Sequence, residues 1–250
     1  MSSNMDSAYY HQMYTLEDGH WWFIARREFA RTLLKQALGP QEQPRILDLG
    51  CGTGGILDSL RGIGPTTGVD VEPMALDFCR ERGHADVIEA SGTELPFMDD
   101  CFDAVVALDV FEHIDDDCKA MEEAFRVLKP GGVAVITVPA YQGLWSRHDV
   151  ALHHHRRYTL GLLSKRLTDA GFAVQHRTYT VTSLLPMTWF IRRVLGPFRN
   201  AGAPVSDIRP TAPWLNQLLL GILRLENSIA SCCSVPFGVT AATVVRKPSA

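Results

Sequence analysis

The sequence predicts an α/β fold in which helices cover both faces of a mostly parallel sheet. Between residues 45 and 138, short strands of Val, Ile, Leu and Ala alternate with helical segments. Continuous apolar strands of this kind are typical of parallel sheets that are buried on both faces. The chain has 250 residues, of which 46% are hydrophobic and 21% are charged. That size and composition suit one large globular domain with a substantial core.

The predicted elements begin with a helical extension over residues 1–44. Phe29, Leu33 and Ala37 recur there at helical spacing, and Gly39-Pro40 ends the helix. The alternating part of the chain follows at once. Its strands are expected at 45–49, 66–69, 86–90, 102–108 and 133–138, and its helices at 56–60, from Pro73 to Gly83, and around Met121, Ala124, Phe125 and Leu128.

The C-terminal half departs from this alternation. An aromatic and basic loop at 139–158 precedes a helix at 159–170 and a strand at 173–182, and a final strand is expected at 239–245. In between, residues 183–238 are apolar, contain several prolines and have few acids. We therefore predict three parts: an N-terminal extension or lid of residues 1–44, a main domain of residues 45–182 and 239–250, and an apolar helical insertion of residues 183–238.

A glycine-rich turn directly after the first predicted strand is the strongest functional signal. Residues 48–55 read Asp-Leu-Gly-Cys-Gly-Thr-Gly-Gly, and Gly50, Gly52 and Gly55 fit the GxGxxG pattern of dinucleotide sites. Because glycines let a backbone approach a ligand closely, this turn is expected to bind an adenosine cofactor. Asp70, at the end of the second strand, suits hydrogen bonding to ribose hydroxyls.

Asp48 distinguishes between two such cofactors. Its carboxylate would repel the pyrophosphate of a dinucleotide, but it would attract a cationic ligand that carries an ammonium group. S-adenosylmethionine carries a sulfonium and an amino group, so it fits this charge better than NAD does. An NAD-dependent oxidoreductase and a catalytically silent cofactor-binding scaffold remain the alternative functions.

Several motifs occur in order, and together they resemble the class I S-adenosylmethionine-dependent methyltransferases. They are Leu47-Asp48-Leu49-Gly50-Cys51-Gly52-Thr53-Gly54, Gly68-Val69-Asp70, Leu95-Pro96-Phe97, Phe102-Asp103-Ala104-Val105-Val106, Phe111-Glu112-His113 and Leu128-Lys129-Pro130-Gly131-Gly132. The resemblance covers about residues 45–182 and is nearest to the branch with ubiquinone and menaquinone biosynthetic enzymes. It implies S-adenosylmethionine as the cofactor and a Rossmann-like, seven-stranded sheet whose last strand, residues 239–245, is antiparallel.

The same resemblance implies roles for residues at the strand ends. The glycines of the turn would line the methionine moiety, and Asp70, followed by Val71, would lie at the ribose. Ser91-Gly92-Thr93 would lie at the adenine, where relatives often carry Asp in place of Ser91. Asp109 and Arg26 are expected at the methionine end. The predicted cofactor-binding residues are Asp48, Gly50, Gly52, Gly54, Asp70, Val71, Ser91, Gly92, Thr93, Asp109 and Arg26.

A loop after the fifth predicted strand is the expected acceptor site. Residues 144–158 contain four histidines, which can act as bases near neutral pH. Arg156 and Arg157 follow them and could clamp an acidic group of the acceptor. We choose His148 and His155 as the catalytic candidates, either for contact with the acceptor or as a base.

The same loop also has a purely structural interpretation. Trp145 and Tyr158 could pack it against the domain, while the arginines pair with surface acids. We predict no metal site in this loop, because adjacent histidines point in different directions and Asp149 is the nearby acid.

The insertion contains apolar residues at helical spacing, namely Leu215, Leu218, Leu219, Ile222, Leu225 and Ile229. Such a face can pack as core or lid. Alternatively, residues 183–231 can form a surface that contacts a membrane peripherally, or a pocket for a lipid tail. Trp189 and Trp214, with arginines nearby, motivate this second hypothesis.

Net charge, cysteine spacing and hydropathy limit the classes of partner and the cellular location that we expect. With 24 Lys and Arg against 28 Asp and Glu, the net charge is -4, so we expect no nucleic-acid partner. The six cysteines show no CxxC spacing, which favours a reducing, cytoplasmic setting. No apolar run reaches the roughly 18 residues of a membrane-spanning helix. The expected methyl acceptor is a small or lipid-linked metabolite.

Overall fold

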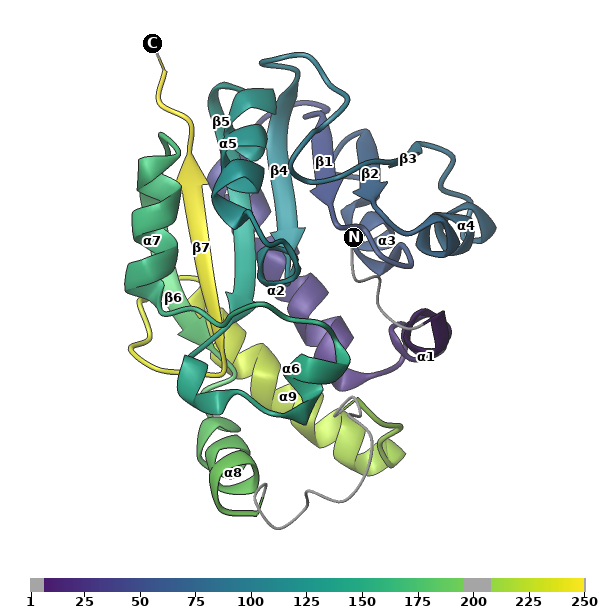
Figure 1. Ribbon diagram of the computed structural model, residues 1–250, viewed down its shortest axis with the longest axis vertical. Coiled ribbons are helices and arrows are strands. Elements are labelled where there is room, and N and C mark those ends of the chain that lie inside the picture. The colour runs from purple at the N-terminus through teal and green to yellow at the C-terminus, as the bar shows by residue number, and fades with distance from the viewer. Residues whose placement is uncertain (1–6, 196–207, 250) are drawn as a thin grey trace.

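The computed structural model describes residues 7–195 and 208–249, and its centre is a seven-stranded sheet (Figure 1). β7 is antiparallel to β5 and β6, whereas the remaining neighbouring strands are parallel. The predicted mostly parallel, seven-stranded sheet with an antiparallel last strand is therefore confirmed. The strands are β1 (Ile46–Leu49), β2 (Thr66–Asp70), β3 (Val87–Glu89), β4 (Phe102–Leu108), β5 (Leu128–Pro139), β6 (Ala173–Thr180) and β7 (Thr240–Arg246), in the spatial order β3-β2-β1-β4-β5-β7-β6.

Helices cover both faces of this sheet, as predicted. Successive residues of a strand point to opposite faces. Leu47 and Val105 accordingly pack with α5 and α7, whereas Ile46 and Ala104 pack with α2 and α3. The helices are α1 (Ser7–Leu16), α2 (Trp21–Leu38), α3 (Gly55–Leu60), α4 (Pro73–Glu81), α5 (Asp117–Val127), α6 (Arg147–Ala151), α7 (Leu160–Asp169), α8 (Leu185–Phe190) and α9 (Pro213–Ala230).

β1 and β4 are neighbours in the middle of the sheet, although β2 and β3 lie between them in the chain. The chain therefore leaves these two strands in opposite directions, and open α/β sheets bind ligands at such switch points, beyond the carboxyl ends of the strands. β1 ends just before Gly50, and β4 ends just before Asp109. In Figure 1, α1, α6 and α8 gather beyond this edge of the sheet. The fold thus brings the predicted site residues to one edge.

β5 is longer than predicted. It begins at Leu128, which pairs with Phe102, and it continues through the Pro-Gly-Gly segment that was expected to be a turn. The register shifts between Phe102 and Ala104, and this irregularity accommodates the extra residues.

The apolar insertion, of which residues 196–207 lie outside the described residues, contains α8, a short π-helical segment η3 (Ile191–Leu195) and α9. In α9, Leu220 and Leu223 are buried against the domain. Trp214, Leu218, Leu225 and Ile229 instead share an exposed face. Within the described ranges, no helix combines the length and the apolar character that crossing a bilayer requires.

Candidate active site

A cavity of about 1710 Å³ lies at the carboxyl ends of β1, β2 and β4. This volume exceeds the roughly 300–1,000 Å³ of a pocket for one small molecule, so a cofactor and an acceptor fit together. The predicted site residues on its wall are Arg26, Gly50, Gly52, Asp70, Val71, Ser91, Gly92, Thr93, Asp109, His148 and His155. Asp48 and Gly54 are the two predicted residues that do not line it.

The glycine turn presents bare backbone to this cavity. Gly50 and Gly52 have φ angles of +72° and +53°, which other residues rarely adopt. A Cβ atom on Gly50 would lie 2.4 Å from Cγ2 of Val110, and one on Gly52 would lie 2.8 Å from Cε of Met13. Both conformation and space therefore require glycine at Gly50, whereas at Gly52 the backbone conformation requires it, because the end of the Met13 side chain can move.

Asp70 holds the turn in place from the end of β2. Its carboxylate accepts hydrogen bonds from the backbone N–H of Gly52 at 2.9 Å and of Glu72 at 3.0 Å. Burial raises the pKa of the carboxyl, although these hydrogen bonds oppose the shift. Each carboxylate oxygen keeps further acceptor capacity, so Asp70 can also accept hydrogen bonds from a ribose.

Asp48 lies on β1, behind the turn. Its side chain is buried, and Oδ2 has no hydrogen-bond partner among the described residues. Burial raises the pKa of this carboxyl to about 8, against the opposing charge of Arg26. A cation bound near Gly50 would favour the ionised form of Asp48.

Gly54 has a packing role at the start of α3. Its φ angle is +92°, and a Cβ atom there would lie 3.1 Å from Cδ of Arg82 and 3.2 Å from Sγ of Cys79. The absence of a side chain therefore lets α3 pack closely against α4.

The N-terminal helix α1 covers the glycine turn. Its neighbour Glu17 accepts a hydrogen bond from the Thr53 hydroxyl and forms an ion pair with Arg82 at 2.9 Å. Tyr10 and Met13 of α1 lie on the cavity wall. These residues were not predicted as site residues, because their contacts join segments far apart in the sequence.

Arg26 and Asp109 form an ion pair at the expected methionine end of the cofactor site. Arg26 Nη1 lies 2.6 Å from Asp109 Oδ2. Arg26 belongs to α2 and Asp109 follows β4, so this ion pair connects the N-terminal helices to the switch point.

The stretch expected at the adenine forms a tight local structure. The hydroxyls of Ser91 and Thr93 lie 2.8 Å apart, and the Thr93 N–H donates to the Ser91 hydroxyl. Gly92 is buried, and a Cβ atom there would lie 3.0 Å from Cδ1 of Ile114. The segment thus offers hydroxyl and backbone groups to the cavity, not a carboxylate.

The histidine loop is anchored by the buried carboxylate of Asp149. It accepts hydrogen bonds from Nδ1 of His154 at 2.9 Å and from Nε of Arg157 at 2.6 Å, and it caps α6 through Ser146. Burial alone would raise the pKa of the Asp149 carboxyl. The hydrogen bonds from His154 and Arg157 and the charge of Arg157 have the larger effect, so the pKa is lowered. Arg156 binds the Asp117 carboxylate and the Ile114 carbonyl. Both arginines therefore have internal partners, which favours the structural interpretation for them.

The two catalytic candidates lie at different places on the cavity wall. His148 belongs to α6, and its ring centroid lies 6.1 Å from that of His154. His155 lies nearer to solvent, with Nδ1 3.7 Å from the Asp115 carboxylate.

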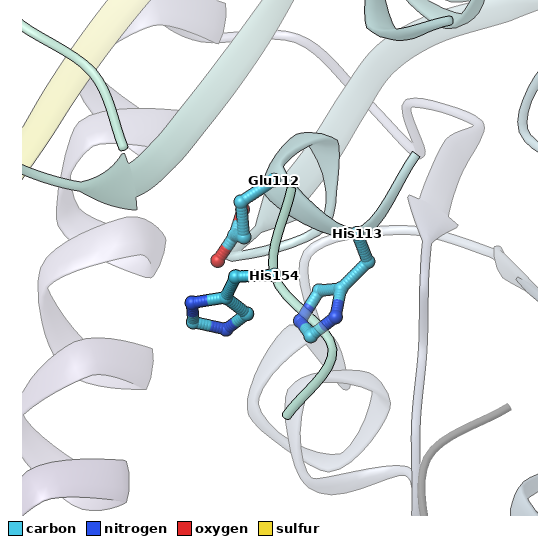
Figure 2. Close-up of side chains that lie close together, drawn as sticks. All are labelled: Glu112, His113 and His154. Carbon is cyan, nitrogen blue, oxygen red and sulfur yellow. The ribbon is translucent and has the colours of Figure 1, made fainter. Parts of the chain in front are cut away.

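Glu112, His113 and His154 form a cluster that the sequence analysis did not select (Figure 2). Glu112 and His113 belong to the 3-10 turn η1 (Phe111–His113) after β4, whereas His154 follows α6. Burial raises the pKa of the Glu112 carboxyl well above its usual range, and the Asp109 charge adds to this. Burial also lowers the pKa of His113 to about 3. The Phe111-Glu112-His113 motif was the only sequence signal, and it did not reveal His154 as the third member.

The comparisons with known proteins find similarity to methyltransferases. A family model described as a methyltransferase domain matches residues 47–136. A probable S-adenosylmethionine-dependent methyltransferase of Mycolicibacterium smegmatis is 27% identical over 229 residues, which cover 84% of this chain and 81% of that protein. A demethylmenaquinone methyltransferase of Chlorobaculum parvum is 34% identical over 125 residues, but these cover only 49% of this chain and 50% of that protein.

The fold has a close counterpart among solved structures. A Haloferax volcanii methyltransferase, solved in complex with the Trm112 methyltransferase activator, matches with a TM-score of 0.61 and 24% identity. The match covers 97% of this chain and 96% of that chain. At this identity, the match supports the fold.

Proposed function

Because this chain belongs to the class I S-adenosylmethionine-dependent methyltransferases, we propose that it methylates a lipid-linked or other small apolar acceptor. One observation carries the proposal: the cavity that begins at the glycine turn continues between apolar side chains of α8 and α9. In this proposal, residues 1–44 and 183–238 form the lid and acceptor side of a main domain of residues 45–182 and 239–250.

The residues at the glycine turn fit S-adenosylmethionine. Gly50 and Gly52 present backbone without a side chain to the cavity, and behind them Asp48 Oδ2 is a buried acceptor atom that has no partner among the described residues. We assign Gly50, Gly52, Arg26 and Asp109 to the methionine end, with Asp48 acting through its charge. Asp70 with Val71 would hold the ribose, and Ser91, Gly92 and Thr93 the adenine.

Bound S-adenosylmethionine supplies an electrophilic methyl group on a sulfonium. The protein's own contribution is to align the acceptor with that methyl group and to exclude water from it. α1 and the loop around α6 cover the site and would exclude water from it. His148 and His155 are proposed to contact the acceptor and to take up a proton where the acceptor must lose one.

The acceptor side of the cavity is largely apolar, although Arg192 and Arg209 also lie on its wall. Leu184, Met187 and Ile191 line it from the first part of the insertion, and Leu215 and Leu219 line it from α9. Such a wall suits a prenyl or acyl chain better than a charged metabolite. A lipid-linked acceptor is therefore favoured over a small polar one.

A transfer assay tests this acceptor class. The protein and methyl-labelled S-adenosylmethionine are incubated with the chloroform-soluble fraction or with the aqueous fraction of a bacterial extract. We expect labelled product from the chloroform-soluble fraction. Product from the aqueous fraction alone contradicts the lipid-linked acceptor, and labelling of neither fraction contradicts transfer to any metabolite.

The exposed apolar face of α9 supports a peripheral membrane contact through residues 183–231. Trp214 is 71% exposed and Leu225 67%, and both belong to the helix that lines the acceptor side of the cavity. Burial of this face in one leaflet would remove it from water and bring the cavity to its lipid acceptor.

Co-sedimentation with vesicles tests this contact. We expect the protein to sediment with vesicles of phosphatidylcholine and phosphatidylglycerol, and Trp214→Ser combined with Leu225→Ser to reduce the bound fraction several-fold. Met98→Ser is the matched control, because Met98 is exposed and apolar but lies outside the insertion. If the wild-type protein stays in the supernatant, the membrane contact is wrong.

A further inference from the structure

Three side chains that can ligate a metal converge on the cavity from two separate segments (Figure 2). One ligand atom from each of Glu112, His113 and His154 lies within 4.8 Å of the other two. All three side chains also line the cavity. Two imidazoles and one carboxylate are a common ligand set of Zn²⁺ and of other divalent transition metals.

Glu112 provides an independent indication of a missing ligand. Its side chain is fully buried, and both carboxylate oxygens lack a hydrogen-bond partner within the described part of the chain. A buried carboxyl without partners is costly, and native proteins satisfy nearly all such groups. A cation between Glu112 and the two histidines would satisfy it.

The two histidines are held by neighbouring groups. Nδ1 of His154 lies 2.9 Å from Oδ1 of Asp149, which fixes the proton on Nδ1 and leaves the lone pair on Nε2. The ring of His113 packs edge-on against that of His154, with the two centroids 4.6 Å apart. Metal-ligating histidines are usually held in this way, by a carboxylate or a backbone carbonyl that accepts from their second nitrogen.

The geometry requires only a modest contraction. With bonds of about 2.0–2.2 Å, the ligand atoms of a tetrahedral site lie roughly 3.4 Å apart. The present separation of up to 4.8 Å is within reach of side-chain rotations, because the three residues lie on a short turn and a loop.

We propose that Glu112, His113 and His154 bind a divalent transition-metal ion, with its open coordination positions facing the acceptor side of the cavity. No metal was expected in the histidine loop, where Asp149 is the nearby acid. In the fold, Asp149 supports His154 instead of ligating, and Glu112 supplies the carboxylate. An oxygen of the acceptor could then complete the coordination shell, which would lower the pKa of that oxygen. This last role rests on the proposed function, whereas ion binding does not.

Metal titration of the full-length chain without a histidine tag tests the site. After dialysis against a chelator, Co²⁺ is added and followed by visible absorption, and Zn²⁺ is then added as a competitor. We expect one Co²⁺ per chain, displaced by Zn²⁺. Glu112→Gln and His113→Asn should each weaken binding about 100-fold or more, because loss of supporting residues alone typically costs about 10–100-fold.

His153→Asn is the matched control. His153 is exposed and adjoins His154, and its φ angle of +54° is one that asparagine tolerates. This variant should bind Co²⁺ like the wild type. Absence of Co²⁺ and Zn²⁺ binding by the wild type, or equal affinity of folded Glu112→Gln, overturns the proposal. S-adenosylhomocysteine binding, measured on the same samples, separates failure of the metal site from failure of the proposed function.

Discussion

Asp48 and Asp70 are buried carboxylates on neighbouring strands, but their partners differ. Asp70 accepts backbone N–H groups from Gly52 and Glu72, whereas Oδ2 of Asp48 has no partner among the described residues. The pKa of Asp48 is accordingly raised to about 8, and burial is the main cause. Asp70 can therefore hold the turn, while Asp48 is suited to respond to a bound cation.

Replacing Asp48 with Asn should uncouple cofactor binding from pH. In the free protein at pH 7 the Asp48 carboxyl is largely protonated, so a cationic cofactor that favours its ionised form should release a proton on binding. Affinity for S-adenosylmethionine should rise with pH between 6 and about 8. Calorimetry in buffers of different ionisation enthalpy measures the number of protons released on binding. Because Asp48→Asn lacks this carboxyl, the protons that it releases come from the ligand itself, and their number is subtracted from the wild-type value. Equal proton release by both proteins would exclude this role.

The same substitution has a predicted effect on stability. Between the unfolded pKa of about 3.9 and the folded pKa of about 8, the folded state binds more protons at Asp48 than the unfolded state does. The contribution of this group to the free energy of unfolding therefore falls as pH rises through that range. Asp48→Asn should remove this decline, and urea unfolding at pH 5 and pH 8 checks it.

At the scale of elements, α1 is held over the glycine turn by a small set of charged residues, of which Arg82 and Glu17 are buried. Arg82, at the end of α4, contacts Glu17, Asp18 and Asp58, and its guanidinium lies 4.7 Å from the ring centroid of Tyr14. The Arg82 side chain is 9% exposed and that of Glu17 is 7% exposed. Arg82 therefore connects the N-terminal covering to α3 and α4.

Loss of this connection should be costly. Arg82→Ala removes the cation paired with the buried Glu17 carboxyl and leaves Arg27 as a neighbouring positive charge, so we expect the free energy of unfolding to fall by about 3 kcal/mol. Arg80→Ala is the control, because Arg80 and Asp77 form an exposed pair, which is worth at most about 0.5 kcal/mol. Urea unfolding followed by circular dichroism measures both. Similar losses for the two variants would refute the anchoring role of Arg82.

At the scale of the whole molecule, the cavity connects parts that are far apart in the chain. Its wall includes α1 and α2, the ends of β1, β2 and β4, the loop around α6, and the described parts of the insertion. A ligand that contacts several of these parts links them together. Ligand binding should therefore stabilise the fold as a unit.

Thermal unfolding with two ligands tests this linkage and the alternative function together. At a concentration of about 100 times Kd, S-adenosylhomocysteine should stabilise the fold by about 2.7 kcal/mol. For a chain of this size the shift in Tm should be roughly 5–10 °C. NAD⁺ at the same concentration should cause no shift. A shift with NAD⁺ and none with S-adenosylhomocysteine would favour the oxidoreductase alternative.

Local sequence signals were sufficient for the sheet and for the cofactor side of the site. The strand and helix order and the glycine turn follow from apolar runs and glycines that are contiguous in the chain, and the resemblance to class I methyltransferases implied the antiparallel β7. Because parallel strands share one carboxyl edge, residues such as Gly50, Asp70 and Asp109 could be expected together. The structure brings these three to one cavity wall.

The tertiary structure alone decided which side chains of the loops and the insertion meet. Helical spacing could not show that α9 buries Leu220 and Leu223 and exposes Trp214 and Leu225, because apolar residues occur around much of that helix. Nor could spacing show that His154 approaches Glu112 across about forty positions of the chain, since irregular loops have no periodicity from which to infer a direction. The sequence therefore determined the fold and the cofactor turn, and long-range packing determined the acceptor side.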